Sequence, residues 1–246
     1  MPATPAWPPQ STPRLFIDSE LADGHDVRVE GGQAHYLSNV MRMKQGAPVK
    51  LFDDRTGEWL AEVSAIGKRD MILRVTGLLR PRESVPDLWL LAAPVKKARL
   101  DMVVEKACEL GVARYQPVLT RRTIIERMNI ERLRATMVEA AEQCGRTALP
   151  EIADGIKLPV LLRDWPEGRT LYFADEEGGV PLAEVAKPGP SAILIGPEGG
   201  FDAEERAAIK ALPQAVAVSL GPRILRAETA ALAAISIWMA AAGDWR

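Results

Sequence analysis

Apolar and polar residues alternate in short runs over the first third of the chain. Five such runs occupy residues 15–17, 27–29, 48–52, 59–63 and 71–75, and turn-forming residues such as Gly and Asp separate them. Short alternating runs bounded by turn residues are typical of half-buried β-strands. The pattern therefore predicts a small antiparallel β-barrel.

A helical piece and two proline-rich segments accompany these strands. Residues 34–41 carry apolar side chains at helical spacing. Residues 1–13 are rich in proline and lack the basic start and apolar core of a signal peptide, so we expect a disordered tail. Prolines and charges over residues 81–86 indicate a linker.

Beyond the linker, buried strands alternate with helices. A continuous apolar run such as residues 88–93 is the mark of a strand that is covered on both faces of a parallel sheet. Strands in alternation with helices predict an α/β domain. We expect strands at residues 88–93, 115–119, 170–174, 192–195 and 216–220, and helices from about residue 100, over 130–144, after residue 202 and over 227–242.

Four residues mark the expected helix ends. Asn129 precedes one helix as an N-cap, and Asp202 with Glu205 three residues on forms a capping box. Gly111 stands where the C-terminal cap of the first helix of the α/β domain belongs.

Composition and charge narrow the functional classes. The chain has 246 residues, of which 47% are hydrophobic and 26% charged, and its formal net charge is −2. These values fit a globular protein, so any nucleic-acid surface must be local. Basic residues outnumber acidic ones over residues 81–150 and the reverse holds over 151–246. This asymmetry fits either an RNA surface or solvated helix faces.

Metal sites and membrane spans are not expected. Cys108 and Cys144 form no CxxC motif, and no cysteine lies near His25 or His35. Two cysteines in a chain of this length indicate a reducing cytoplasm. The apolar run over residues 230–242 is too short to cross a bilayer.

Two glycine-containing loops carry the strongest signal of a site. Residues 195–201 and 219–230 each leave an expected buried strand and enter a helix. Each loop by itself could be a plain turn. Two such loops at the carboxyl ends of strands are where open α/β sheets bind ligands, so together they favour a binding site.

The sequence lacks the motifs of several other enzyme classes. It contains no GxGxxG fingerprint, no Walker-A lysine, no GxSxG elbow and no Cys–His or Ser–His–Asp set. The neighbouring carboxylates Glu176–Glu177 and Glu204–Glu205 are the kind usually found solvated on a surface. Hydrolase and oxidoreductase chemistry therefore lack support.

The two loops belong to the segments LIGPEGGF at 194–201 and LGPRILRAETAAL at 220–232. These segments resemble the signature motifs of the RsmE family of SPOUT-class methyltransferases. The resemblance covers nearly the whole chain after the tail. Further similar segments are KKARLDMVVEKACELGV at 96–112, EQCGR at 142–146, and, in a PUA-like barrel, PRLF at 13–16, HYLSNVMRMKQG at 35–46 and LFDD at 51–54.

The resemblance implies an α/β fold: a SPOUT-type parallel sheet with a C-terminal deep trefoil knot, preceded by a small PUA-like β-barrel. The expected domains are a tail at 1–13, the barrel at 14–80 and the methyltransferase domain at 81–246. Two departures stand out. Asp54 replaces a glycine usual at a tight turn, and FADEEGG at 173–179 is a looser match, which puts a ligand role for Glu176 in doubt.

The implied activity is S-adenosylmethionine-dependent methylation of N3 of a uridine in 16S rRNA of the small subunit, by a cytoplasmic homodimer without metal. Two alternatives remain open: a SPOUT methyltransferase with another rRNA or tRNA target, and a non-catalytic RNA-binding assembly factor. The family's cofactor residues map onto Leu194, Ile195, Gly196, Glu198, Gly199, Gly200, Ser219, Leu220, Gly221, Ile224, Leu225, Arg226 and Thr229.

Candidate catalytic and RNA-contacting residues follow from the same motifs. Arg226 is the candidate cation beside the developing negative charge, although it could hold a phosphate or pair with Glu228. Glu142 and Glu228 are the candidate bases. The candidates for RNA contact are Arg14, Arg42, Lys44, Lys96, Lys97 and Arg99.

Overall fold

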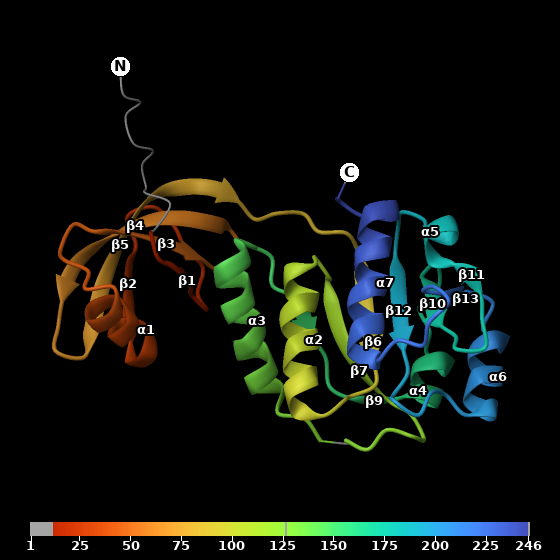
Figure 1. Ribbon diagram of the computed structural model, residues 1–246. Coiled ribbons are helices and arrows are strands. Elements are labelled where there is room, and N and C mark those ends of the chain that lie inside the picture. Colours follow the sequence, from red (N-terminus) through yellow and green to blue (C-terminus); the bar gives the residue numbers. More distant parts are fainter. Residues whose placement is uncertain (1–11, 126, 246) are drawn as a thin grey trace. The chain divides into compact units, whose positions relative to one another are not determined.

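The computed structural model describes residues 12–125 and 127–245, which form two compact units (Figure 1). The barrel unit comprises Met1–Ser84 and Ala141–Ala148. The sheet unit comprises Val85–Ala140 and Leu149–Arg246. Of the predicted tail, only residues 12 and 13 belong to the described part of the chain.

The barrel unit is built on a five-stranded sheet with strand order β1-β3-β4-β5-β2. Neighbouring strands are antiparallel except β1 and β3, which are parallel. The antiparallel prediction is wrong for this pair, because alternation of apolar residues shows that one face of a strand is buried but does not fix the direction of each pairing. The strands are β1 (Arg14–Phe16), β2 (Asp26–Glu30), β3 (Pro48–Phe52), β4 (Gly57–Ile66) and β5 (Asp70–Pro81).

Alternate strand residues and one helical segment fill the core of the barrel unit. Val49 and Leu51 of β3 are fully buried, whereas Lys50 between them is half-buried. The predicted helix forms α1 (Gly31–His35) followed by a π-helical turn, η1 (Tyr36–Val40). Leu37 in this turn is fully buried and packs in the same core.

A buried aspartate organises the turn between β3 and β4. The Asp53 carboxylate accepts hydrogen bonds from the backbone N–H groups of Leu21 (2.8 Å), Arg55 (2.9 Å) and Thr56 (2.7 Å). Burial raises the pKa of Asp53, but these bonds and one from the Thr56 hydroxyl outweigh it and hold the pKa below its usual value. Asp54 has φ +58°, in the left-handed region that glycine adopts more readily than other residues.

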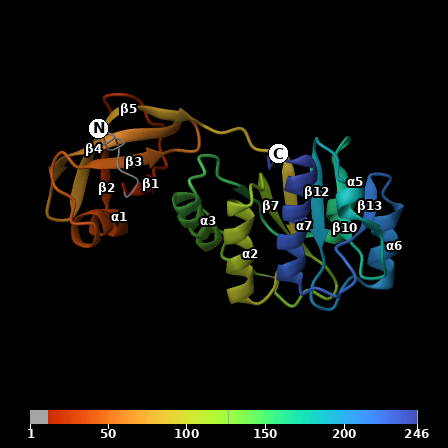
Figure 2. The same ribbon diagram turned by 45° about the horizontal axis from the view of Figure 1, so that its top comes forward.

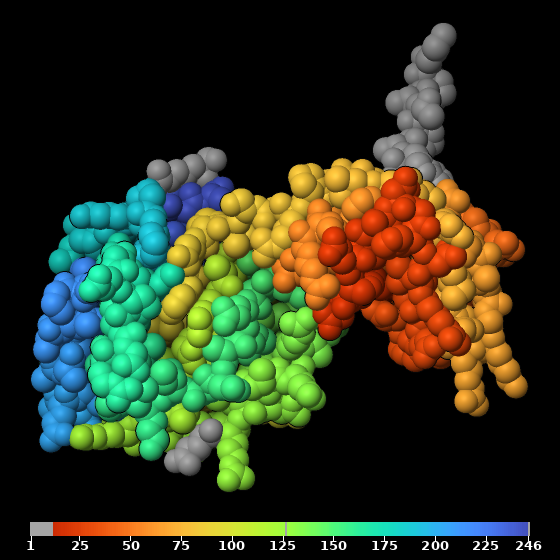
Figure 3. Space-filling model, turned by 180° about the vertical axis from the view of Figure 1, so that it is seen from behind, coloured from red at the N-terminus to blue at the C-terminus, as the bar shows by residue number. Residues whose placement is uncertain are grey.

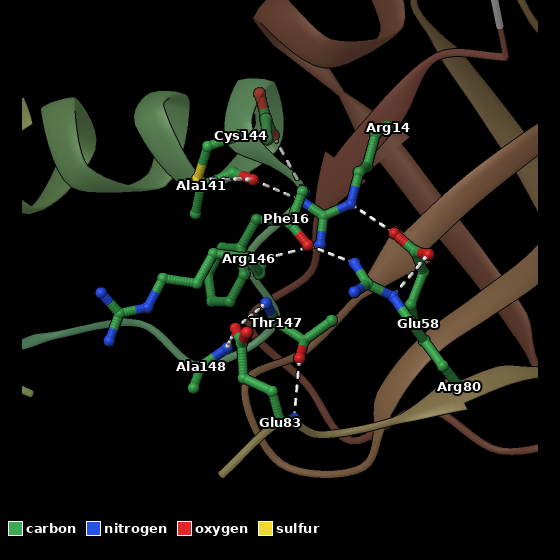
Figure 4. A network of polar contacts seen from close by, with 12 residues as sticks. Arg14, Phe16, Glu58, Arg80, Glu83, Ala141, Cys144, Arg146, Thr147 and Ala148 are labelled. Atoms are coloured by element: carbon green, nitrogen blue, oxygen red, sulfur yellow. Dashed lines mark hydrogen bonds and ion pairs between the residues drawn. The ribbon is translucent and has the colours of Figure 1, made fainter. Parts of the chain in front are cut away.

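Residues 141–148 pack within the barrel unit although they follow much of the sheet unit in sequence. Figure 4 shows the polar network that holds them. Arg14 donates to the backbone carbonyl of Arg146 at 2.7 Å and forms an ion pair with Glu58. Its guanidinium carbon lies 3.8 Å from the ring centroid of Phe52.

A second set of bonds in the same network joins the end of the barrel to this segment. The Glu83 backbone N–H donates to Thr147 Oγ1 at 2.9 Å. In return, Glu83 Oε1 accepts from the backbone N–H groups of Thr147 (2.6 Å) and Ala148 (2.9 Å). The sequence did not predict this association, since it joins residues more than sixty positions apart.

The sheet unit contains a parallel sheet, as predicted, and this sheet has eight strands, three more than the sequence pattern indicated. Its order is β11-β13-β10-β12-β6-β7-β8, with β9 also paired to β7, and every pair is parallel. The strands are β6 (Leu88–Ala92), β7 (Arg114–Leu119), β8 (Glu151–Ile152), β9 (Ile156–Lys157), β10 (Thr170–Ala174), β11 (Val180–Pro181), β12 (Ser191–Ile195) and β13 (Ala215–Ser219).

Helices cover both faces of this sheet. Figures 1 and 2 show α2 and α7 side by side on one face, with α3 beyond α2. On the other face, Leu158 and Leu161 of α4 and Ile209 of α6 join a core with Leu171 and Leu194, and this side is seen in Figure 3. The helices are α2 (Lys97–Glu109), α3 (Ile130–Cys144), α4 (Leu158–Arg163), α5 (Leu182–Val185), α6 (Ala203–Ala211) and α7 (Ala227–Ala242).

The predicted helix starts are confirmed by their hydrogen bonds. Asn129 Oδ1 accepts from the backbone N–H of Arg132 at 2.9 Å. Asp202 Oδ1 accepts from the Glu205 N–H at 2.8 Å, and Glu205 Oε2 accepts from the Asp202 N–H at 3.1 Å. The Glu205 N–H and the Arg121 guanidinium hold the pKa of Asp202 below its usual value. This capping box fixes where α6 begins.

Candidate functional site

The carboxyl ends of three neighbouring parallel strands meet at one edge of the sheet. β10 lies between β12 and β13. The loops that leave these strands are residues 175–179, 196–202 and 220–226. Ligands of open α/β sheets bind outside such strand ends. The two predicted loops therefore lie where the sequence expected a site, and a third loop joins them.

The three loops line a cavity of about 390 Å³. This volume lies in the range of small-molecule sites, which begins at roughly 300 Å³. Backbone atoms of glycines contribute to its surface, and carboxylates and guanidinium groups add charge. Its apolar wall comes from Ile195, Phe201, Val218, Leu220, Leu225 and Ala230.

Three glycines in these loops have backbone conformations that other residues rarely adopt. Gly178 has φ +111°, Gly200 has φ +67° and Gly221 has φ +118°. A β-carbon on Gly200 would also collide with the carboxylate of Glu176. Glycine at position 200 therefore lets the loop after β12 lie against the loop after β10.

An acidic segment after β10 forms one side of the cavity. Asp175 and Glu176 line the cavity, and Arg206 of α6 binds both carboxylates at 3.1 and 2.9 Å and also pairs with Glu177. Lys210 Nζ lies 2.9 Å from Asp175 Oδ2. Sequence reasoning missed Asp175, although a polar residue directly after a buried strand was a signal that could have found it.

The candidate catalytic arginine lies free at the cavity. Arg226 lines it, is exposed and forms no ion pair with any described residue. The alternative pairing with Glu228 is not observed. Glu228 Oε1 lies 3.3 Å from Arg99 Nε instead. Arg99 Nη1 also lies 3.8 Å from Glu198, which lines the cavity.

Two family models match the chain. Residues 81–239 match the model of an RNA methyltransferase domain. The chain belongs to this RNA methyltransferase family. Residues 29–76 match the model of an RNA methyltransferase PUA domain, which covers most of the barrel strands.

Curated and solved relatives agree with this assignment. A ribosomal RNA small subunit methyltransferase E from Rickettsia conorii is 30% identical over 229 residues, covering 91% of this chain and 93% of the relative. The enzyme of that name from Bacillus subtilis is 26% identical, covering 91% and 94%. A ribosomal RNA small subunit methyltransferase E from Neisseria gonorrhoeae, solved with S-adenosylmethionine bound, is 27% identical with a TM-score of 0.87, covering 96% and 100%.

These findings confirm the fold class predicted from the resemblance, a SPOUT-type parallel sheet preceded by a PUA-like barrel. The deep trefoil knot stays a prediction.

Most of the predicted cofactor residues of this RNA methyltransferase line the cavity. Three do not. Leu194 is fully buried in the core, the Gly199 carbonyl accepts a hydrogen bond from Arg122, and Thr229 is exposed on α7. The predicted residues that line it are Ile195, Gly196, Glu198, Gly200, Ser219, Leu220, Gly221, Ile224, Leu225 and Arg226.

The two candidate bases do not line the cavity. The Glu142 carboxylate lies in the barrel unit, where its Oε1 accepts a hydrogen bond from the Phe16 N–H at 2.9 Å. The Glu228 carboxylate is buried beside Arg99. Neither carboxylate belongs to the lining of the cavity, so their role as bases stays a prediction.

The candidates for RNA contact divide into two groups. Arg14 is buried in the network of Figure 4, so it stabilises the barrel unit in place of its predicted RNA contact. Arg99 binds carboxylates. The other four candidates are exposed and available to phosphate groups: Arg42, Lys44, Lys96 and Lys97.

No group of three or more potential metal ligands occurs among residues 12–125 and 127–245. Within the same residues, no helix has the length and apolar character needed to cross a membrane.

Proposed function

We propose that this chain transfers a methyl group from S-adenosylmethionine to N3 of a uridine in 16S rRNA of the small ribosomal subunit. The proposal rests chiefly on the cavity at the ends of β10, β12 and β13, because the two motifs shared with the RsmE family line it. Membership of an RNA methyltransferase family and relatives solved with S-adenosylmethionine support the same reading.

The cavity suits S-adenosylmethionine in its chemistry. Its apolar wall, with Leu220 and Leu225, can pack on an adenine ring, and backbone groups of the loops can bind the polar edge of that ring. The carboxylates of Glu176 and Glu198 complement the positive sulfonium and ammonium groups. When bound, the cofactor supplies an electrophilic methyl group.

Arg226 is the proposed electrostatic catalyst. Removal of the N3 proton of uracil leaves negative charge on its two carbonyl oxygens, and a nearby cation stabilises that charge. Arg226 lies at the cavity, is exposed and has no carboxylate partner among the described residues. Its guanidinium is thus free to donate to those oxygens.

Among the residues that the structure describes, neither Glu142 nor Glu228 lines the cavity. Glu142 and Glu228 both bind other groups of the protein. We propose that alignment of N3 with the methyl group supplies much of the acceleration, since effective molarities in aligned reactions are very high. The imide proton then leaves to solvent or to a carboxylate at the cavity.

The proposed substrate is the assembled small subunit. A-form RNA helices offer proteins little sequence information, so an isolated rRNA helix would be a poorly distinguished target. The exposed Arg42, Lys44, Lys96 and Lys97 are proposed to contact its phosphates. The proposal includes a cytoplasmic homodimer.

Methyl transfer from labelled S-adenosylmethionine to 30S subunits from a strain that lacks this gene tests the proposal. We expect 3-methyluridine at a single site. Incorporation of the label into tRNA or 23S rRNA instead would mean that the chain methylates another RNA. No transfer to any RNA, with no cofactor binding in calorimetry, would favour a non-catalytic assembly factor.

A further inference from the structure

Glu228 is a buried carboxylate in the first turn of α7. The residue is 7% exposed. Its Oε1 pairs with Arg99 Nε at 3.3 Å, while its Oε2 has no hydrogen-bond partner among the described residues. An unsatisfied buried carboxylate oxygen is costly, so a group that binds it is expected.

Tyr115 of β7 presents a matching hydroxyl. Its side chain is fully buried, and its Oη has no hydrogen-bond partner in the described part of the chain. Burial raises the pKa of Tyr115, so the phenol stays protonated and can donate. Tyr115 thus supplies a donor and Glu228 an acceptor.

Tyr115 and Glu228 line the same small cavity, whose volume is about 10 Å³. That volume is close to the space for one water-sized probe. The remaining wall is apolar, and includes Val95, Leu100, Val103 and Ile195. A single water that accepts from Tyr115 and donates to Glu228 is the ligand this cavity fits.

Arg99 connects this buried pair to the cofactor cavity. Beyond Glu228, its guanidinium lies 3.8 Å from Glu198 in the loop after β12. Glu198 lines the larger cavity, and so do Leu225 and Arg226, which directly precede α7. Arg99 therefore faces carboxylates on two of the segments that form the cofactor cavity.

We propose that Arg99 and Glu228 are positioning residues of the cofactor site, and that one water between Glu228 and Tyr115 completes their ion pair. The pair holds the first turn of α7 in register with the loop after β12. This inference rests on the proposed function, because it assumes that the larger cavity binds S-adenosylmethionine.

Three variants test the assignment: Arg99→Met, Glu228→Gln and the double variant, with Arg163→Met as a control for loss of an exposed arginine on α4. Calorimetry gives the cofactor Kd, and thermal unfolding without cofactor gives Tm.

We expect each single variant to weaken cofactor binding about tenfold. The cofactor Kd of the double variant should equal that of the single variant with the larger Kd, because each substitution removes the same contact. For Glu228→Gln we expect the cofactor Kd to change by a larger factor than kcat at saturating cofactor, because a positioning residue acts through binding.

Tyr115→Phe tests the water. Loss of a bridged hydroxyl should lower Tm without cofactor, whereas removal of a hydroxyl with no partner should leave Tm unchanged or raise it. An unchanged or raised Tm would overturn the water site. Additive effects of Arg99→Met and Glu228→Gln on Tm would overturn the pairing.

Loss of turnover in Glu228→Gln with unchanged cofactor affinity would make Glu228 a base and overturn its positioning role. If the unaltered chain failed to bind S-adenosylmethionine, the proposed function would fail. The Tm comparison would still decide whether the Arg99–Glu228 pair exists, so the two failures are distinguishable.

Discussion

Arg14 and Glu58 form an ion pair in which both side chains are more than nine-tenths buried. Glu58 lies on β4 and also binds Arg80 at 3.1 Å, while Arg14 reaches the carbonyl of Arg146. Burial raises the pKa of Glu58, but its bonds to Arg14 and Arg80 outweigh this and hold the pKa below its usual value. The pair is thus charged at neutral pH.

Arg14→Met should strongly destabilise the barrel unit. Removal of one partner of a buried ion pair costs about 3–5 kcal/mol when the other charge is left uncompensated. Arg80 remains bound to Glu58, so we expect a loss near the lower end of that range. Chemical denaturation followed by tryptophan fluorescence, with Trp59 in the barrel unit, measures the loss. Arg28→Met is the matched control, since the Arg28 side chain is 63% exposed and its ion pairs should contribute less than about 1 kcal/mol. Equal effects of the two variants would contradict the structural role of Arg14.

Asp54→Gly should stabilise the chain slightly. A residue with a β-carbon at φ +58° carries strain that glycine avoids, so we expect a gain of up to about 1 kcal/mol. Loss of the ion pair between Asp54 and Arg82 offsets part of this gain. Asp54→Ala keeps the strain, loses the carboxylate and should destabilise. Thermal unfolding gives the change in Tm for both variants. Changes of the same sign would contradict the explanation from backbone strain.

The stability of the barrel unit should fall in acid through Asp53. Its folded-state pKa is held below the ordinary value of 3.8, so its stabilisation is complete above that value. Protonation at lower pH removes the charge that the Leu21, Arg55 and Thr56 N–H groups bind, and the stabilisation is lost as the pH falls through the folded-state pKa. Urea titrations at a series of pH values give the free energy of unfolding. Between about pH 4 and pH 2 this free energy should fall less steeply for Asp53→Asn than for the unaltered chain. An unchanged slope would assign the decline to other carboxylates.

Gly200→Ala should weaken cofactor binding. The new methyl group meets the Glu176 carboxylate, which Arg206 holds from the other side, and the backbone has φ +67°. We expect the Kd for S-adenosylmethionine to rise about tenfold or more. Gly168→Ala is the control, because Gly168 has φ +78° with open space around it. A normal Kd in calorimetry for Gly200→Ala would show that the loop tolerates a side chain.

Arg226→Ala should slow methyl transfer without loss of cofactor affinity. Removal of one group that stabilises developing charge typically lowers kcat by roughly 10²–10³-fold. Single-turnover rates on saturating 30S subunits give the chemical step, and filter binding gives RNA affinity. Arg163→Ala controls for loss of an exposed positive charge in the same unit. A near-normal rate with normal RNA binding would remove Arg226 from the mechanism.

Local features of the fold were predictable because short-range rules determine them. The ranges of α3, α7 and β10 agree with the sequence patterns, and the Asp202–Glu205 capping box follows from a spacing of three residues. The direction of β1 was not predictable, since its partner lies more than thirty residues away.

Predictions of charged partners failed where those partners are distant in sequence. Arg14 bears the same charge whether it lies on a surface or binds Glu58 and residues 141–148. Glu228 could have paired with Arg226 two positions away, but Arg99 from α2 takes that place. Motif resemblance identified the loops of the site, and only packing revealed which of their side chains reach the cavity.

The assignment of residues 141–148 to the barrel unit has a consequence for synthesis. A nascent chain that ends at Ser84 has all five strands of the barrel but lacks the carbonyl that binds Arg14 and the N–H groups that bind Glu83. We therefore expect the N-terminal domain to reach its final stability only after more than fifty further residues have left the ribosome. A gene fragment that ends at Ser84 should yield a barrel that is less stable and more sensitive to protease than the barrel of the full chain.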